Sequence, residues 1–71
     1  MEKLKKILEK AYFYGKLPKG FSLYTINRLF DIYTALRSGQ SAEFIESEIH
    51  DVLVKCKIKV KPSGIGWIAY K

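Results

Sequence analysis

Residues 57–70 read KIKVKPSGIGWIAY, and over this stretch the spacing of apolar side chains changes from the helical period to a period of two. Lysine alternates with isoleucine or valine as far as Lys61, and 67–70 is rich in residues that favour strands. The order Pro-Ser-Gly at 62–64 is typical of a three-residue hairpin loop. We therefore expect a two-stranded antiparallel β-hairpin over about 57–70.

A loop of this length would also set the register of the hairpin. It pairs Lys59 with Trp67 and Ile58 with Ile68, and side chains then alternate between the two faces. One face would be apolar, with Ile58, Val60, Ile68 and Tyr70. The other face would combine three lysines with apolar residues, namely Lys57, Lys59, Lys61, Ile65, Trp67 and Ala69. Because unpaired ammonium groups are costly to bury, we expect this second face to be exposed and the first to pack on helices.

Upstream of the hairpin, apolar side chains recur at the spacing of an amphipathic helix in three segments. Ser22 and Ser41 stand where an N-cap is needed, and Gly15 and Gly39 stand where helices commonly end. We expect helices over about 2–14, 22–38 and 41–55. The predicted fold class is α+β, with a three-helix core followed by the C-terminal hairpin.

The chain has 71 residues, which is room for one small domain over 1–71 and for a modest core. No apolar stretch approaches the roughly 20 residues that span a membrane, so we expect no membrane partner. The single cysteine, Cys56, excludes an internal disulfide and fits a reducing, cytoplasmic compartment. Eleven lysines against two arginines suggest an AT-rich genome, such as that of a bacterium or a phage.

Ala35 lies four residues before Gly39, Ile45 lies six residues after it, and Ser41 can open the next helix. With the order of helix, helix, tight turn, helix and basic hairpin, this spacing resembles the winged helix, a DNA-binding fold. The resemblance implies a helix-turn-helix over these residues. The second helix of that motif would display four acidic side chains, which disfavour its entry into the DNA major groove: Glu43, Glu46, Glu48 and Asp51.

The net charge of +6 comes from 13 basic residues against seven acidic ones, and it is unevenly distributed. Residues 57–71 contain no acid and four lysines, which are Lys57, Lys59, Lys61 and Lys71. Lysines spaced two apart can follow a phosphate backbone, and Trp67 can stack on a base. We therefore predict a small non-enzymatic nucleic-acid-binding or regulatory protein that uses these lysines and Trp67. Lysine on an edge strand also prevents aggregation, which is the simpler explanation of the pattern.

The alternative prediction is a protein-protein interaction module, such as a phage or mobile-element modulator of a host protein. Tyr12, Phe13 and Tyr14 are consecutive, so one helix cannot bury all three, and Tyr24 and Phe44 lie off the apolar stripes. The acidic 41–55 segment and the basic hairpin have opposite charge, which would allow two copies of the chain to pair as a homodimer.

The sequence offers no set of residues for catalysis or for a cofactor. His50 and Asp51 are neighbours on a predicted helix and would point about 100° apart, which is unsuitable for an aligned dyad. One histidine and one cysteine are too few for a zinc site, and no phosphate-binding glycine loop is present. We expect no enzyme activity, no cofactor, no metal and no small-molecule substrate.

Overall fold

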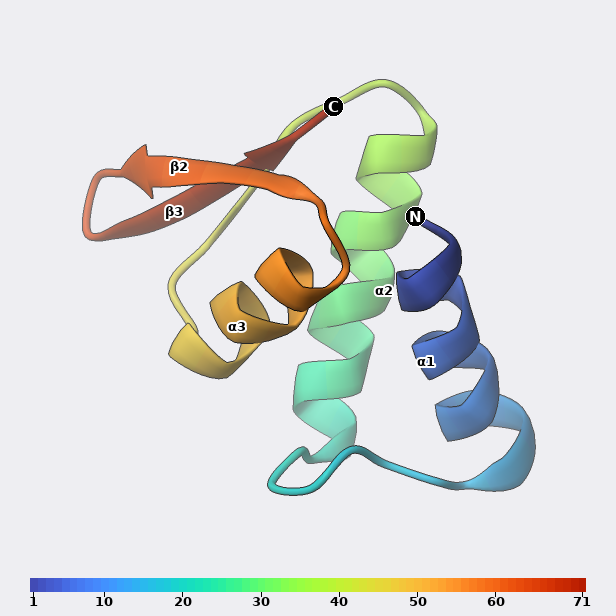
Figure 1. Cartoon of the computed structure of the whole chain (residues 1–71). Coiled ribbons are helices and arrows are strands. Elements are labelled where there is room, and N and C mark those ends of the chain that lie inside the picture. Colours follow the sequence, from blue (N-terminus) through green and yellow to red (C-terminus); the bar gives the residue numbers. More distant parts are fainter.

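The computed structural model describes residues 1–71 and confirms an α+β fold in which helices precede the hairpin (Figure 1). The helices are α1 (Glu2–Tyr14), α2 (Leu23–Arg37) and α3 (Ser47–Lys55). The strands are β1 (Ala42–Phe44), β2 (Lys59–Ser63) and β3 (Gly66–Tyr70). No helix of the structure combines the length and the apolar character needed to cross a membrane.

The first two helices have the limits that their capping residues predict. Gly15 ends α1 with a left-handed φ of 65°, which glycine adopts without a steric penalty. Ser22 is the N-cap of α2, and its hydroxyl accepts a hydrogen bond of 3.3 Å from the backbone N–H of Thr25. The sequence therefore contains enough local information to define both helices.

The prediction of a helix over 41–55 is wrong in its first part, because residues 42–44 form β1 and α3 begins only at Ser47. Pairing of β1 with β3 buries the Phe44 side chain, which is 2% exposed, and satisfies the backbone through the sheet. Glu46, and not Ser41, is the N-cap of α3. The predicted helix-turn-helix is therefore absent, since a strand separates α2 from α3.

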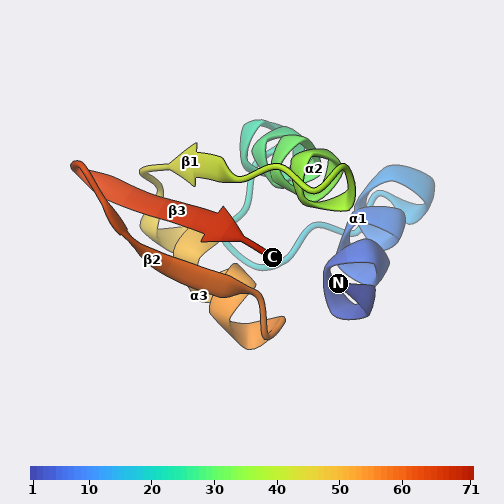
Figure 2. The ribbon, with the colours of Figure 1, turned by 90° about the horizontal axis from the view of Figure 1, so that it is seen from above.

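The sheet has three antiparallel strands in the order β1-β3-β2, whereas the sequence predicted only the two-stranded hairpin (Figure 2). The predicted register is also wrong. Ser63 pairs with Gly66, so the loop contains two residues, and Gly64 occupies its first position with a φ of 57°. The first residue of a two-residue hairpin loop has a positive φ, which glycine adopts most easily. Lys59 consequently pairs with Tyr70 and not with Trp67.

The shift in register exchanges the faces of β3 relative to β2. The inner face, which is directed toward the helices, carries Ala42, Phe44, Val60, Pro62, Trp67 and Ala69. The indole of Trp67 packs against the core, with its centroid 5.7 Å from that of Phe44 and 4.6 Å from that of His50. The expectation that Trp67 shares an exposed face with the lysines is therefore wrong.

The helices cover only this inner face. Helix α3 contacts β2, and α2 contacts both β1 and β3. Twelve buried apolar residues form one core, to which each helix contributes, together with Phe44 and Ala69 from the sheet. Figure 2 views the molecule from the side of the sheet, and no helix lies in front of the strands. The opposite, outer face of the sheet is thus left open.

Candidate functional site

The outer face of the sheet consists of the side chains that alternate with those of the inner face: Glu43, Lys59, Lys61, Ser63, Gly66, Ile68 and Tyr70. Neither Ile68 nor Tyr70 is among the residues packed against the core, although both are partly buried by their neighbours on the sheet. Lys59 pairs with Tyr70 and Lys61 pairs with Ile68, so two lysines lie directly beside two apolar side chains.

Tyr70, and not Trp67 as the sequence predicted, is the aromatic residue that lies beside the lysines of β2. The ammonium Nζ of Lys61 lies 5.3 Å from the centroid of the Tyr70 ring, which is a cation–π distance. This diagonal contact follows from the register, since Lys61 and Tyr70 stand on adjacent strands of one face. The outer face thus combines a flat aromatic side chain with flexible positive charges.

A groove of about 150 Å³ lies at the end of the sheet where β2 begins and β3 ends, next to the start of α1 and the end of α2. It is lined by Met1, Leu36, Lys57, Ile58, Lys59, Tyr70 and Lys71. Three of the predicted site lysines, at positions 57, 59 and 71, therefore line one groove together with Tyr70, and Lys61 reaches the ring of Tyr70. We call Lys57, Lys59, Lys61, Lys71 and Tyr70 together the lysine–tyrosine surface.

Lys57 has an unusual backbone conformation in this surface. It follows the C-cap of α3 with a φ of 63°, the only positive φ at a residue other than glycine, and its N–H donates to the carbonyl oxygen of Val54. Helices often end in this way, but glycine is the residue that does so at low cost. The chain therefore has a lysine side chain at a position where glycine would be less strained.

The charges of this surface are not neutralised within the chain. The structure has one ion pair between a basic residue that is always charged and a carboxylate, Arg28–Glu46, and no lysine lies within ion-pair distance of a carboxylate. On the outer face the one acid is Glu43, which pairs with Ile68 on the side opposite to Lys61. Positive charge therefore lies over β2 and the end of β3, and the only negative charge lies over β1.

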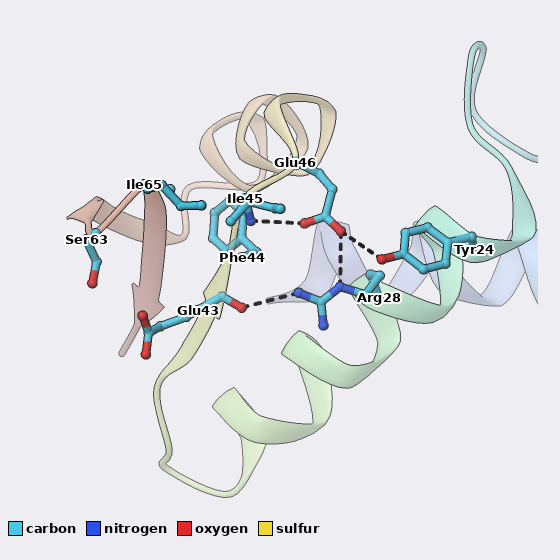
Figure 3. A pocket seen from close by; sticks show the side chains of 10 residues that line it. Tyr24, Arg28, Glu43, Phe44, Ile45, Glu46, Ser63 and Ile65 are labelled. Atoms are coloured by element: carbon cyan, nitrogen blue, oxygen red, sulfur yellow. Dashed lines mark hydrogen bonds and ion pairs between the residues drawn. The ribbon is translucent and has the colours of Figure 1, made fainter.

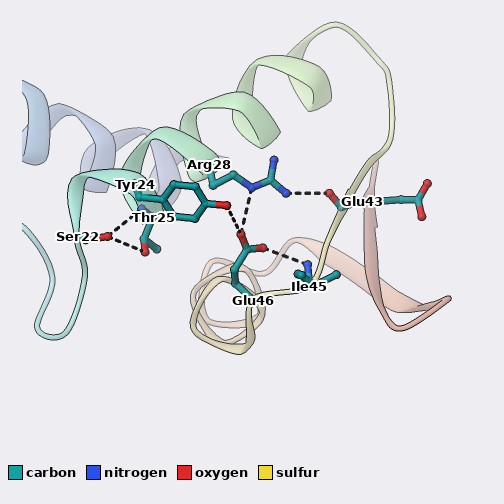
Figure 4. Close-up of polar contacts among 7 residues, drawn as sticks. All are labelled: Ser22, Tyr24, Thr25, Arg28, Glu43, Ile45 and Glu46. Atoms are coloured by element: carbon teal, nitrogen blue, oxygen red, sulfur yellow. Dashed lines mark hydrogen bonds and ion pairs between the residues drawn. The ribbon is translucent and has the colours of Figure 1, made fainter.

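A larger hollow of about 510 Å³ lies between α2, the β1–α3 junction and the tip of the hairpin (Figure 3). Its polar groups bind one another. Arg28 Nε donates to Glu46 Oε2 at 3.2 Å, and Arg28 Nη2 donates to the Glu43 carbonyl oxygen at 3.4 Å. The other Glu46 oxygen accepts a hydrogen bond from the Ile45 backbone N–H (Figure 4). These contacts join α2 to the junction of β1 and α3.

The ionisation of Glu46 fits this structural role. Desolvation by burial acts to raise the pKa of Glu46. Hydrogen bonds from the backbone N–H groups of Glu46 and Ile45, with the hydrogen bond and charge of Arg28, outweigh it and hold the pKa below its ordinary value. Glu46 is therefore ionised at neutral pH, has no proton to donate, and serves to join α2 to the junction of β1 and α3.

His50 and Cys56 also have structural surroundings. The Nδ1 of His50 is 3.4 Å from Asp51 Oδ1, a contact that the predicted helical geometry did not suggest, and the imidazole ring packs on Trp67. Burial raises the pKa of the Cys56 thiol, although the N-terminal amine and Lys3 act in the opposite direction. Cys56 is buried in the core and is thus kept as a thiol.

A second exposed surface lies where α1 ends and α2 begins (Figure 1). Six of the eleven large apolar residues that are exposed come from 12–24: Tyr12, Phe13, Tyr14, Leu17, Leu23 and Tyr24. We call this group the aromatic end. The sequence predicted the exposed aromatic side chains of α1 and Tyr24, but Phe44, which it grouped with them, is buried.

The structure thus brings four of the five predicted site residues together and removes Trp67 from them. The residue that the sequence reasoning missed is Tyr70, and a two-residue loop beginning at Gly64 would have placed it beside Lys59. No protein family, no curated protein and no solved structure matches the chain in comparisons with known proteins.

Proposed function

We propose that the protein binds nucleic acid through the lysine–tyrosine surface. The observation that carries the proposal is that Lys57, Lys59 and Lys71 line one groove with Tyr70, while Lys61 lies over the ring of Tyr70 beside a sheet face that no helix covers. None of the four ammonium groups has a carboxylate partner in the chain. They are therefore available to phosphate groups without first breaking an ion pair.

The chemistry of this surface favours contacts to the backbone of the nucleic acid. A lysine is a point charge on a flexible stem, and it neutralises phosphate without recognising the sequence of bases. Binding then draws much of its free energy from the release of counterions, which makes it strongly dependent on salt. We propose a non-enzymatic, regulatory or protective role in which sequence preference is weak.

The helices are poorly suited to the alternative, in which a helix would insert into a groove of duplex DNA. Helix α3 has only nine residues, and Glu48 and Asp51 are exposed on it. Carboxylates at the surface of a helix oppose its approach to phosphates. The open sheet, and not a recognition helix, is the surface with the required charge.

The test is a titration of a fluorescein-labelled oligonucleotide, single-stranded or duplex, followed by anisotropy at 50 and 200 mM salt. If up to four phosphates are neutralised, the association constant is expected to fall about 50- to 150-fold between these concentrations. Binding that is absent at 50 mM salt, with the fold intact by circular dichroism, would contradict the proposal.

A second candidate function is the recognition of an acidic protein through the aromatic end. Phe13 is 75% exposed and Tyr14 is 72% exposed. Residues 10–30 contain Lys10, Lys16 and Lys19 but no acid, so this stretch of the chain is positively charged. Exposed aromatic groups of this kind dominate many protein interfaces. This candidate gains if no nucleic acid binds at low salt.

A further inference from the structure

We infer that the ligand of the lysine–tyrosine surface is a single strand of nucleic acid, which lies along β2 and β3 with a base stacked at Tyr70. The inference rests on the proposed function and specifies the form of nucleic acid that the outer face can accept. It is carried by the order in which apolar, positive and negative side chains follow one another across the sheet.

The apolar part of the outer face lies along β3. Ile68 and Tyr70 point outward from this strand, and Gly66 continues the same row toward the tip of the hairpin without a side chain. Bases have apolar faces that stack on such side chains, but in a duplex those faces are already stacked on one another. A duplex would therefore leave Ile68 and Tyr70 without a partner, whereas a single strand can cover both.

The charged residues indicate where the sugar-phosphate backbone would lie. Lys59 and Lys61 stand on β2, on one side of the apolar row, and Glu43 stands on β1, on the other side. Phosphates are attracted to β2 and repelled from β1. With the backbone over β2, the bases of a single strand extend over β3 and reach Ile68 and Tyr70.

The length of the surface suits a short segment. Five residues of β3 span about 17 Å at the rise of an antiparallel strand, which is room for a few nucleotides. Lys57 and Lys71 extend the positive charge beyond one end of this path, in the groove beside Tyr70. At the other end Ser63 and Gly66 are small, so the strand can leave the sheet without obstruction.

Tyr70 and Lys61 would act together. Tyr70 is partly exposed, and the flexible ammonium group of Lys61 lies over its ring, 5.3 Å from the ring centroid. A base that stacks on this face displaces the ammonium, which then lies beside the phosphate of the same strand. The cation–π contact thus places the charge within reach of a ligand that stacks on the ring.

The experiment compares a 12-nucleotide single-stranded oligothymidine with a 12-base-pair duplex, each labelled and titrated with the unaltered protein at 50 mM salt. We expect the single strand to bind at least about tenfold more tightly, because only it can use the aromatic ring. Equal affinity for the two forms, or tighter binding of the duplex, would overturn the inference and leave the proposed function standing. Binding of neither form would overturn both.

Two variants of Tyr70 provide the matched control. Tyr70→Leu keeps an apolar side chain but removes the ring, and it is expected to weaken single-strand binding about 5- to 100-fold without changing duplex binding. Tyr70→Phe keeps the ring and is expected to bind within about twofold of the unaltered protein. Loss of affinity that is the same for both variants, or for both forms of nucleic acid, would contradict stacking at Tyr70.

Discussion

Replacement of Gly66 by alanine is expected to remove most of the free energy of unfolding of the protein at 25 °C. A Cβ at this position would overlap the carbonyl oxygen of Phe44 and would lie 2.8 Å from Cα of Ile45. Both are backbone atoms, so the overlap is relieved only if β1 moves away from β3. That movement exposes Phe44, and we expect a loss of about 3 kcal/mol, which is comparable to the whole stability of so small a domain.

The measurement is urea denaturation followed by far-ultraviolet circular dichroism, with Gly64→Ala as the matched control. Gly64 has a φ of 57° and open space around it, so an added methyl group there costs only backbone strain, about 1 to 2 kcal/mol. Equal stability of the two variants would show that β1 does not approach β3 as closely as the structure has it.

Replacement of Lys59, Lys61 and Lys71 by glutamine is expected to cause the largest loss of nucleic-acid affinity, about 100-fold or more at 50 mM salt. The salt dependence is measured as the slope of the logarithm of the association constant against the logarithm of the salt concentration. Each phosphate contact that is lost reduces the magnitude of this slope by about 0.7 to 0.9. We therefore expect the slope of the triple variant to be smaller by about 2 to 3 units. The three side chains are exposed and not ion-paired, so the fold should be retained.

A control with the same change in net charge separates this surface from general electrostatic attraction. Lys10, Lys16 and Lys19 are also exposed, and they belong to the second half of α1 and the segment between α1 and α2. Their replacement by glutamine is expected to weaken binding less than about fivefold, because distant charges are largely screened by salt. Losses of equal size in the two triple variants would contradict a site on the sheet.

Two features of the fold do not depend on how the strands pair, and these could be predicted from the sequence: the first two helices and the exposure of the lysines in 57–61. Capping residues and apolar periodicity define α1 and α2, because each signal is local and each agrees with the other. The lysines of 57–61 were assigned correctly to solvent because alternate residues of a strand share a face whatever strand pairs with it.

The remaining features depend on contacts between distant parts of the chain. Three residues of β1 are too few to show a period of two, and their strand exists because β3 offers an unpaired edge about 25 residues away. The sequence around Gly64 is compatible with loops of two or three residues. Because these lengths place Tyr70 and Trp67 on opposite faces, the identity of the exposed aromatic residue could not be predicted from local pattern alone.

The most direct test of the account is a map of the binding surface by nuclear magnetic resonance. The ¹⁵N-labelled protein would be titrated with the single-stranded oligothymidine, and the change in each backbone amide shift would be measured. The account predicts the largest changes at Lys57, along β2 and from Ile68 to Lys71, with little change in the aromatic end. Changes concentrated in α3 or in residues 12–24, with the sheet unaffected, would contradict it.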